Sequence, residues 1–308
     1  MKRIISIAEP TVLTIGNFDG VHTAHQKLIV QTKYLAQKNG LKSVICTFDR
    51  NTKGSKMIMS SRQFYSVLSQ TGIDYLATLR FFEEIMHLSC EEFVSEYICK
   101  RFCAEYVVVG ENFRFGVHRI GDVNVLKSLG KRFGFQVICF KTCYAGKQQI
   151  SSTWLRELIE SGKVHLANRY LYQPFTVNAK VKSGFSLGNQ LLDYPTANLS
   201  IPKNTVSIPF GVYMTKTEVD GTVYPSITNV GYAPTYRKEK PTIETYIFDF
   251  SGNLYGKQIQ VMFLRYLRSE RKFASIESLK NQIQKDVLKC RSLHGKDFTN
   301  EVYTGIEK

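Results

Sequence analysis

The sequence lacks the features that mark membrane, secreted and low-complexity proteins. No apolar run reaches the roughly 18 residues expected of a membrane-spanning helix, and the apolar stretch near the N-terminus is too short for a signal peptide. The seven cysteines are an odd number and include no Cys-x-x-Cys pair, so the sequence predicts neither a disulfide framework nor a zinc knuckle. We therefore expect a soluble, cytoplasmic protein whose cysteines are ordinary buried thiols.

Acidic residues are scarce relative to basic ones. The chain has 26 Asp and Glu against 41 Lys and Arg, a formal net charge of +15. Such an excess favours nucleic acid, an anionic membrane surface or a phosphorylated small molecule as a partner, and a solvated basic surface fits it equally. Because no run of Lys or Arg exceeds two residues and no RNA-binding motif is present, we expect no nucleic acid partner. We expect no membrane partner either, and the sequence leaves the oligomeric state open.

The length of 308 residues, with 43% hydrophobic and 12% aromatic residues, predicts two domains of roughly 150 residues with real cores. In the first half, strand-like runs alternate with helical patterns. Strands are expected at residues 12–15, 43–48, 75–81, 105–109 and 136–140, and helices at residues 25–37, 61–70 and 89–102. This order predicts a doubly wound α/β fold with a parallel sheet, whose ligands bind beyond the carboxyl ends of the strands.

The second half has a different pattern. A helix expected over residues 153–170 is followed by short β-rich runs, with a Val-Asp-Gly-Thr hairpin turn at 219–222. These runs span residues 176–181, 211–218, 222–228, 243–248 and 259–264. The pattern predicts an antiparallel β-barrel, closed by an amphipathic helix over 275–288. We place the domain boundary at residue 170, giving domains 1–170 and 171–308.

A glycine-containing loop comes directly after the first expected strand. Residues 16–22 read Gly-Asn-Phe-Asp-Gly-Val-His, and His25 follows three residues after His22. The glycines permit a tight turn whose amides can face a phosphate, next to the positive end of a helix. The two histidines project from nearly the same side and can stabilise charge that develops on phosphorus during nucleotidyl transfer. A purely structural histidine pair is the alternative.

A second polar group of residues lies in the β-rich half. Thr196 and Asn198 are two apart, so in an extended segment both side chains lie on one face, where their oxygens can reach Mg²⁺ and phosphate. Glu244 lies in a β-prone run, where a carboxylate is unfavoured unless it faces solvent or a site. A carboxylate there can act as the general base of a phosphoryl transfer, and an exposed strand glutamate is the alternative.

These motifs carry a resemblance to a known family. Residues 16–25, 107–116 and 150–156 resemble the adenylyltransferase half of bacterial bifunctional riboflavin kinase/FAD synthetases, a variant of the His-x-Gly-His nucleotidyltransferase fold. Residues 170 to 292 resemble the riboflavin kinase module of the same family, through 195–199 and 243–246 among other motifs. The resemblance implies phosphorylation of riboflavin to FMN by ATP in the second domain. It implies adenylylation of FMN to FAD, with release of pyrophosphate, in the first.

The resemblance also implies roles for single residues. Three would be catalytic: His22 and His25 at the ATP phosphates, and Glu244 as the base for the riboflavin 5′-hydroxyl. The ATP-binding residues would be Gly16, Asn17, Phe18, Asp19, Asn112, Ser152, Thr153, Arg156, Thr196 and Asn198. Thr196 and Asn198 would also be the Mg²⁺ ligands, and Arg268 and Phe273 would contact the flavin. For Ser152 and Thr153, a simple helix N-cap is the alternative.

The chain departs from the family pattern at three places. Ala24 stands where the family has glycine between the histidines, residues 49–52 read Asp-Arg-Asn-Thr instead of Glu-Pro-His-Pro, and Asp193 replaces a glycine. The first two departures lie in the adenylyltransferase half and favour an alternative, a riboflavin kinase with a weakened or lost FAD synthetase site. The net charge motivates a second alternative, a flavin-responsive RNA-binding regulator.

Overall fold

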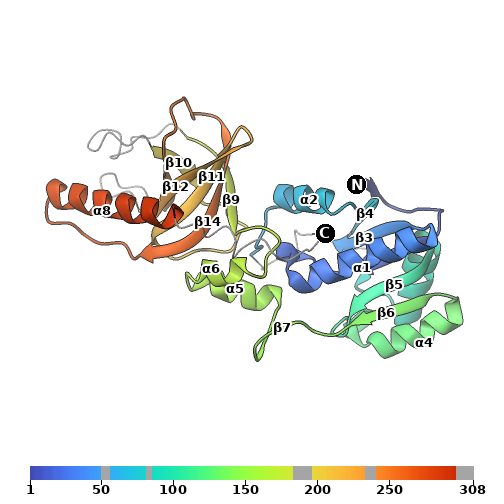
Figure 1. Ribbon diagram of the computed structural model, residues 1–308. Coiled ribbons are helices and arrows are strands. Elements are labelled where there is room, and N and C mark those ends of the chain that lie inside the picture. The colour runs from blue at the N-terminus through green and yellow to red at the C-terminus, as the bar shows by residue number, and fades with distance from the viewer. Residues whose placement is uncertain (50–55, 81–84, 183–195, 233–240, 296–308) are drawn as a thin grey trace. The chain divides into compact units, whose positions relative to one another are not determined.

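The computed structural model of the chain describes residues 1–49, 56–80, 85–182, 196–232 and 241–295. The chain forms two compact units (Figure 1), the first made of Met1–Ser55 with Ser61–Ser152 and the second of Lys56–Ser60 with Thr153–Lys308. This division follows compactness, and the domain boundary predicted at residue 170 stays a prediction.

The first unit is built on a six-stranded parallel sheet with the strand order β1-β4-β3-β2-β5-β6. Its strands are β1 (Lys2–Ile4), β2 (Thr11–Ile15), β3 (Lys42–Phe48), β4 (Tyr75–Leu79), β5 (Ala104–Gly110) and β6 (Gln136–Phe140). Its helices are α1 (Thr23–Asn39), α2 (Ser61–Gln70), α3 (Cys90–Phe93), which continues as a π-helix over Val94–Arg101, and α4 (Val123–Phe133). The predicted doubly wound fold is confirmed.

Strand β2 is the point where the order of the strands reverses. The chain continues from β2 to β3 on one side, and β5 pairs with β2 on the other. Helices cover both faces, since Leu28 of α1 packs with Val12, while Leu13 on the opposite face packs in a cluster with Phe93. The loops that follow β2 and β5 therefore start at the same edge of the sheet, which is where doubly wound folds bind their ligands.

The prediction for the first half of the chain was incomplete. It missed β1, α4 and the short hairpin of β7 (Tyr144–Ala145) and β8 (Gln148–Gln149). The single helix expected over 153–170 was wrong, because the chain forms α5 (Ser152–Glu160) and α6 (Val164–Asn168) instead. Gly162 lies between them at φ +77°, a left-handed conformation that ends a helix.

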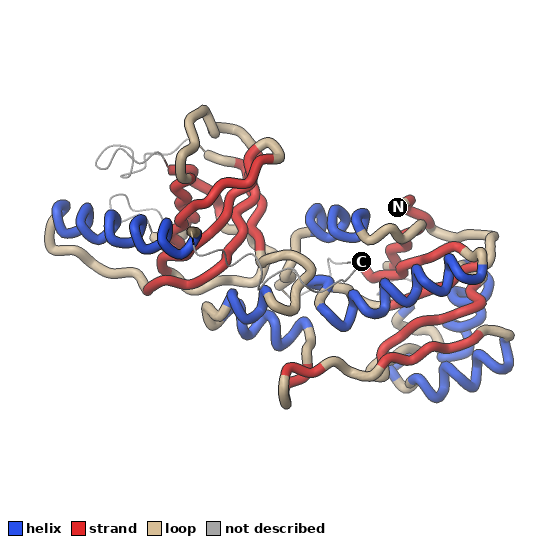
Figure 2. Tube along the Cα trace, viewed as in Figure 1, coloured by secondary structure: helices blue, strands red, loops and turns tan. Residues whose placement is uncertain are grey.

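The second unit contains a six-stranded antiparallel sheet with the strand order β10-β13-β12-β11-β14-β9. The tube view draws these strands in red, with α8 beside them in blue (Figure 2). Its strands are β9 (Thr176–Lys180), β10 (Thr196–Ser200), β11 (Gly211–Val219), β12 (Thr222–Gly231), β13 (Thr242–Ile247) and β14 (Gln258–Arg268). The Lys182 amide, just after β9, donates to the Asn198 carbonyl of β10 at 2.9 Å, so the edge strands meet. The predicted antiparallel barrel is confirmed.

The interior of the barrel holds a ladder of hydroxyl groups. Thr215 Oγ1 lies 2.8 Å from both Ser226 Oγ and Thr228 Oγ1, and Thr228 Oγ1 lies 2.9 Å from Thr245 Oγ1. All four residues are buried, and each hydroxyl satisfies another. Because side chains alternate along a strand, the residues between them point to the outer face of the barrel.

Residues 56–60 belong to the second unit although they lie between β3 and α2 in the sequence. The Met57 amide donates to the Asn204 carbonyl at 2.9 Å, and the Val206 amide donates to the Met57 carbonyl at 2.9 Å. Lys56 Nζ adds a hydrogen bond to Ser207 Oγ at 2.6 Å. The chain therefore enters the second unit once before it returns to the first at α2.

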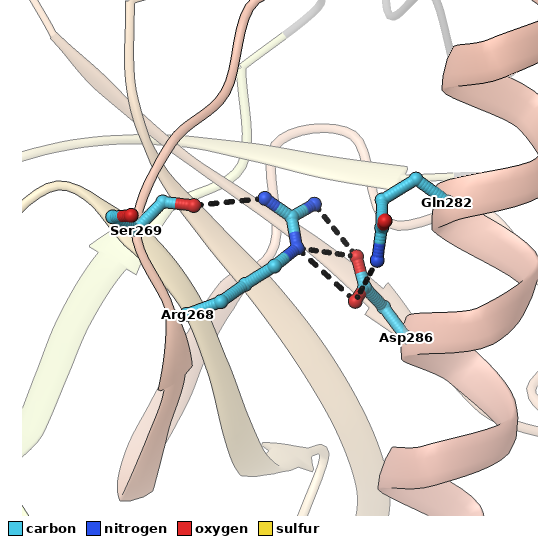
Figure 3. A network of polar contacts seen from close by, with 4 residues as sticks. All are labelled: Arg268, Ser269, Gln282 and Asp286. Atoms are coloured by element: carbon cyan, nitrogen blue, oxygen red, sulfur yellow. Dashed lines mark hydrogen bonds and ion pairs between the residues drawn. The ribbon is translucent and has the colours of Figure 1, made fainter.

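Helix α8 (Ile276–His294) covers the outer face of the barrel and is longer than the helix expected over 275–288. A largely buried ion pair ties it to β14: the Arg268 guanidinium donates to both Asp286 oxygens at 2.6–3.1 Å, and Gln282 Nε2 donates to Asp286 at 2.9 Å (Figure 3). Neither α8 nor another helix in the described ranges has the length and apolarity needed to cross a membrane.

Replacing Asp286 with alanine should destabilise the second unit by about 3–5 kcal/mol, because the Arg268 charge loses its partner in a poorly solvated place. The two side chains are only 15% and 9% exposed. Asp249→Ala is the matched control, because Asp249 accepts two hydrogen bonds from Arg291 of α8. The side chains of Arg291 and Asp249 are 41% and 76% exposed, respectively. The loss in this control should be much smaller, because solvent screens an exposed ion pair. Equal shifts of the two variants in thermal unfolding would contradict the assignment.

Candidate active sites

The loop after β2 has an unusual backbone. Phe18 and Val21 have φ of 50° and 41°, and Gly20 lies between them at φ 77°. Positive φ is costly for residues other than glycine, above all for a β-branched one, and such conformations gather at functional sites. Gly16 has no Cβ, and a Cβ there would lie 3.3 Å from the Phe18 ring. The buried Phe18 therefore packs directly on the backbone and shapes the loop.

The two histidines of this loop lie in contact. His22 is the N-cap residue of α1, and its ring stacks on that of His25 with centroids 3.7 Å apart and 21° between the planes. The Phe18 ring lies 5.0 Å from His25 on a tilted plane. The prediction that the i, i+3 spacing places both imidazoles together is confirmed. Both imidazoles lie at the positive end of α1, where an anion is stabilised.

His25 is held in its neutral form. Burial lowers its pKa well below 6.5, and the neighbouring His22 lowers it further. Its Nδ1 atom is buried and has no hydrogen-bond partner in the described part of the chain. A neutral imidazole can donate one hydrogen bond and accept another. The His25 ring can therefore still form a hydrogen bond with a ligand.

The stability of the first unit should fall as the pH drops below 6.5. There the unfolded chain binds a proton at residue 25 that the folded chain does not, because burial lowers the pKa of His25 in the folded state. The contribution is complete above pH 6.5, and below it the loss approaches about 1.4 kcal/mol per pH unit. His25→Gln should reduce this slope, measured by hydrogen exchange of α1 amides at stepwise urea concentrations. An unchanged slope would contradict the direction of the shift.

Two further predicted ATP ligands lie in the first unit. The Ser152 hydroxyl donates to the Asp19 carbonyl at 3.0 Å, so the structure brings Ser152 to the loop that follows β2. Asn112 is exposed just after β5, where its Oδ1 lies 3.0 Å from the position of a Cβ on Gly110. The loops after β2 and β5 thus both carry predicted site residues.

Asn17, Thr153 and Arg156 are three more of the predicted ATP ligands. Asn17 is exposed, and its carbonyl accepts a hydrogen bond from Thr47 Oγ1 at 3.4 Å. Thr153 and Arg156 lie on the first turns of α5, within the second unit. Their contact with the nucleotide stays a prediction. Residues 50–52, which depart from the family pattern, lie outside the described residues.

The register of the barrel lines up four polar residues. Glu244 on β13 lies opposite Asn198 on β10 and opposite Asn229 on β12, and Lys182 lies opposite Asn198. Paired residues on neighbouring strands point to the same face, about 5 Å apart. We call Lys182, Asn198, Glu244 and Asn229 the polar row. Thr196 lies two residues before Asn198 and therefore faces the same side, as predicted.

Two oxygens at this place fit a bound cation, and the Thr196 hydroxyl can also donate to a phosphate oxygen. Thr196 Oγ1 and Asn198 Oδ1 are both buried, and neither has a hydrogen-bond partner within the described ranges. Buried polar atoms without a partner are rare in folded proteins. Mg²⁺ prefers oxygen ligands and takes few from the protein when nucleotide phosphates supply the rest. The described residues contain no group of three or more His, Cys, Asp or Glu side chains that could hold a metal.

The two predicted flavin contacts lie near the end of β14. Arg268 has protein partners, because Asp286 and the Ser269 carbonyl accept its hydrogen bonds. Phe273 is half-buried in the segment before α8. Their contact with the flavin stays a prediction, and Asp193 lies outside the described residues.

Comparisons with known proteins match both units. The FAD synthetase family matches residues 4–154, and the riboflavin kinase family matches residues 171–294. Two proteins named bifunctional riboflavin kinase/FMN adenylyltransferase are each 32% identical to this chain. The match to the protein of Buchnera aphidicola subsp. Acyrthosiphon pisum covers 94% of this chain and 95% of the relative. The match to the protein of Escherichia coli K12 covers 93% of this chain and 94% of the relative.

The same protein name belongs to a Bacillus subtilis relative, 32% identical over 90% of both chains. A crystal structure described as a macrolide-efflux protein from Streptococcus pneumoniae superposes with a TM-score of 0.85 at 27% identity. That structural match covers 94% of this chain and 99% of the other.

Proposed function

The chain belongs to the bifunctional riboflavin kinase/FMN adenylyltransferase family, and from this premise we infer that it makes FAD from riboflavin in two ATP-dependent steps. It is a transferase that phosphorylates riboflavin to FMN and then adenylylates FMN to FAD. The observation that carries this conclusion is the match of both enzyme families along one chain, at residues 4–154 and 171–294.

For the kinase reaction we propose that Glu244 is the general base. It accepts the proton of the riboflavin 5′-hydroxyl as that oxygen attacks the γ-phosphorus of ATP, and the bond to the β-γ bridging oxygen of ADP breaks. The unpartnered oxygens of Thr196 and Asn198 support a role as ligands of Mg²⁺·ATP. When bound, Mg²⁺ offsets the negative charge of the phosphates. Lys182, next to Asn198 in the polar row, adds positive charge on the same side.

For the adenylyltransferase reaction we propose that the loop of residues 16–22 and the start of α1 bind the phosphates of ATP. A phosphate oxygen of FMN attacks the α-phosphorus, and pyrophosphate leaves. His22 and His25 donate hydrogen bonds to phosphate oxygens where negative charge increases in the transition state. The neutral state of His25 supports this role, because a neutral ring needs no counterion when the site is empty. Ser152 fixes the loop through the Asp19 carbonyl.

An assay of the purified chain with riboflavin, ATP and Mg²⁺ tests the proposal. Chromatography should show FMN first and FAD later, and supplied FMN should also be converted to FAD. Absence of both products would overturn the proposed function. Accumulation of FMN with no conversion of supplied FMN would show that the chain has only the kinase activity. The departures from the family pattern at Ala24 and residues 49–52 make this outcome worth testing.

A further inference from the structure

Asn229 is the member of the polar row that no role yet explains. It lies near the end of β12, directly opposite Glu244, and is half-buried. Its side-chain amide makes no hydrogen bond to another residue in the described ranges. Asparagine is disfavoured in strands, where β-branched residues pack better. Neither strand propensity nor a partner among the described residues therefore explains an amide at this position.

The order of side chains across the sheet gives the two sides of Glu244 different chemistry. On one side lie Asn198 and then Lys182, the groups suited to a metal-bound triphosphate. On the other side lies Asn229, followed on β11 by the apolar Val212. This second side offers an uncharged donor and acceptor next to Glu244. The first charge further along the row is Arg268 on β14, beyond Val212, and it is paired with Asp286.

Phosphoryl transfer requires the attacking and leaving oxygens to lie roughly in line on opposite sides of phosphorus. The base must lie beside the attacking oxygen. If the triphosphate lies on the Asn198 side of Glu244, the acceptor alcohol comes from the Asn229 side. We propose that Asn229 binds the ribityl chain of riboflavin and orients its terminal hydroxyl toward Glu244.

The chemistry of the amide suits this substrate. Each ribityl hydroxyl is both a donor and an acceptor, and a single asparagine offers Oδ1 as an acceptor and Nδ2 as a donor. Because the amide is uncharged, it adds no repulsion beside the Glu244 carboxylate, whereas an aspartate there would repel that carboxylate. Asn229 is then a specificity-determining residue for the polyol part of the acceptor. This inference rests on the proposed kinase function.

Steady-state kinetics of riboflavin phosphorylation by Asn229→Ala test the inference. Loss of the amide should raise the KM for riboflavin about tenfold, the effect of one lost hydrogen bond in a partly buried site, and leave the KM for ATP within about twofold. Lumiflavin, which keeps the flavin ring and lacks the ribityl chain, should inhibit wild type and variant with equal Ki. Asn178→Ala, at another half-buried asparagine of a barrel strand outside the polar row, should change neither constant.

A second variant separates binding from folding. Asn229→Thr places a strand-favouring residue at the position, so the fold should be retained while the reach of the amide is lost. Its KM for riboflavin should rise as in the alanine variant, with an unchanged thermal midpoint. An unaltered KM for riboflavin, a parallel rise in the KM for ATP, or an equal loss of lumiflavin affinity would overturn the role of Asn229. Absence of FMN production by the wild-type chain would instead overturn the proposed function itself.

Discussion

Glu244→Gln should lower the rate of riboflavin phosphorylation by a factor of about 10²–10⁴ and leave the conversion of supplied FMN to FAD intact. The substitution keeps the size of the side chain and its place on β13 between Asn198 and Asn229. It removes only the capacity to accept a proton from the attacking hydroxyl. The loss should therefore fall on kcat, with the KM values for riboflavin and ATP changing little.

Glu218→Gln is the matched control for this experiment. Glu218 is also a half-buried glutamate on a strand of the same barrel, on β11 opposite Val223 and Gln260, and lies outside the polar row. Its replacement should leave both activities unchanged. Kinase turnover of Glu244→Gln within a few-fold of wild type would show that Glu244 is not the general base, even if the chain makes FMN.

Local periodicity was enough to predict several features of both sites. The i, i+3 spacing of His22 and His25 at a helix start placed their rings together, and the structure stacks them at 3.7 Å. The i, i+2 spacing of Thr196 and Asn198 predicted one shared face, because side chains alternate along a strand. Alternation of strands and helices likewise predicted the parallel sheet of the first unit and therefore the edge at which the loop after β2 lies.

Features set by pairing between distant segments could not be predicted this way. Asn229 and Glu244 are neighbours only because of the register between β12 and β13, which composition does not encode. The contact of Met57 with Asn204 and Val206 joins segments about 150 residues apart and leaves no local pattern. Arg268 was predicted to contact flavin from its motif. Nothing in its local sequence predicted that Asp286, which lies 18 residues later on α8, accepts its hydrogen bonds.

His25→Ala should have the opposite effect to Glu244→Gln. Removing one hydrogen-bond donor that acts on developing charge costs about 10²–10³ in rate, so FAD formation from supplied FMN should fall by this factor. Riboflavin phosphorylation should be retained, because His25 belongs to the first unit and the polar row to the second. The lost ring is stacked on His22 and tilted against Phe18. A change in folding is therefore checked by the thermal midpoint.

The informative measurement is pyrophosphate release from ATP in the presence of FMN, followed in parallel with FMN production from riboflavin. His87→Ala is the control, since His87 is an exposed histidine of the same unit outside the loop of residues 16–22. It should change neither rate. Each active-site substitution is expected to slow one step strongly and to spare the other. Equal loss of both steps in His25→Ala would therefore contradict two separate sites. Retention of pyrophosphate release would show instead that the stacked pair only supports the loop, the structural alternative that its spacing alone leaves open.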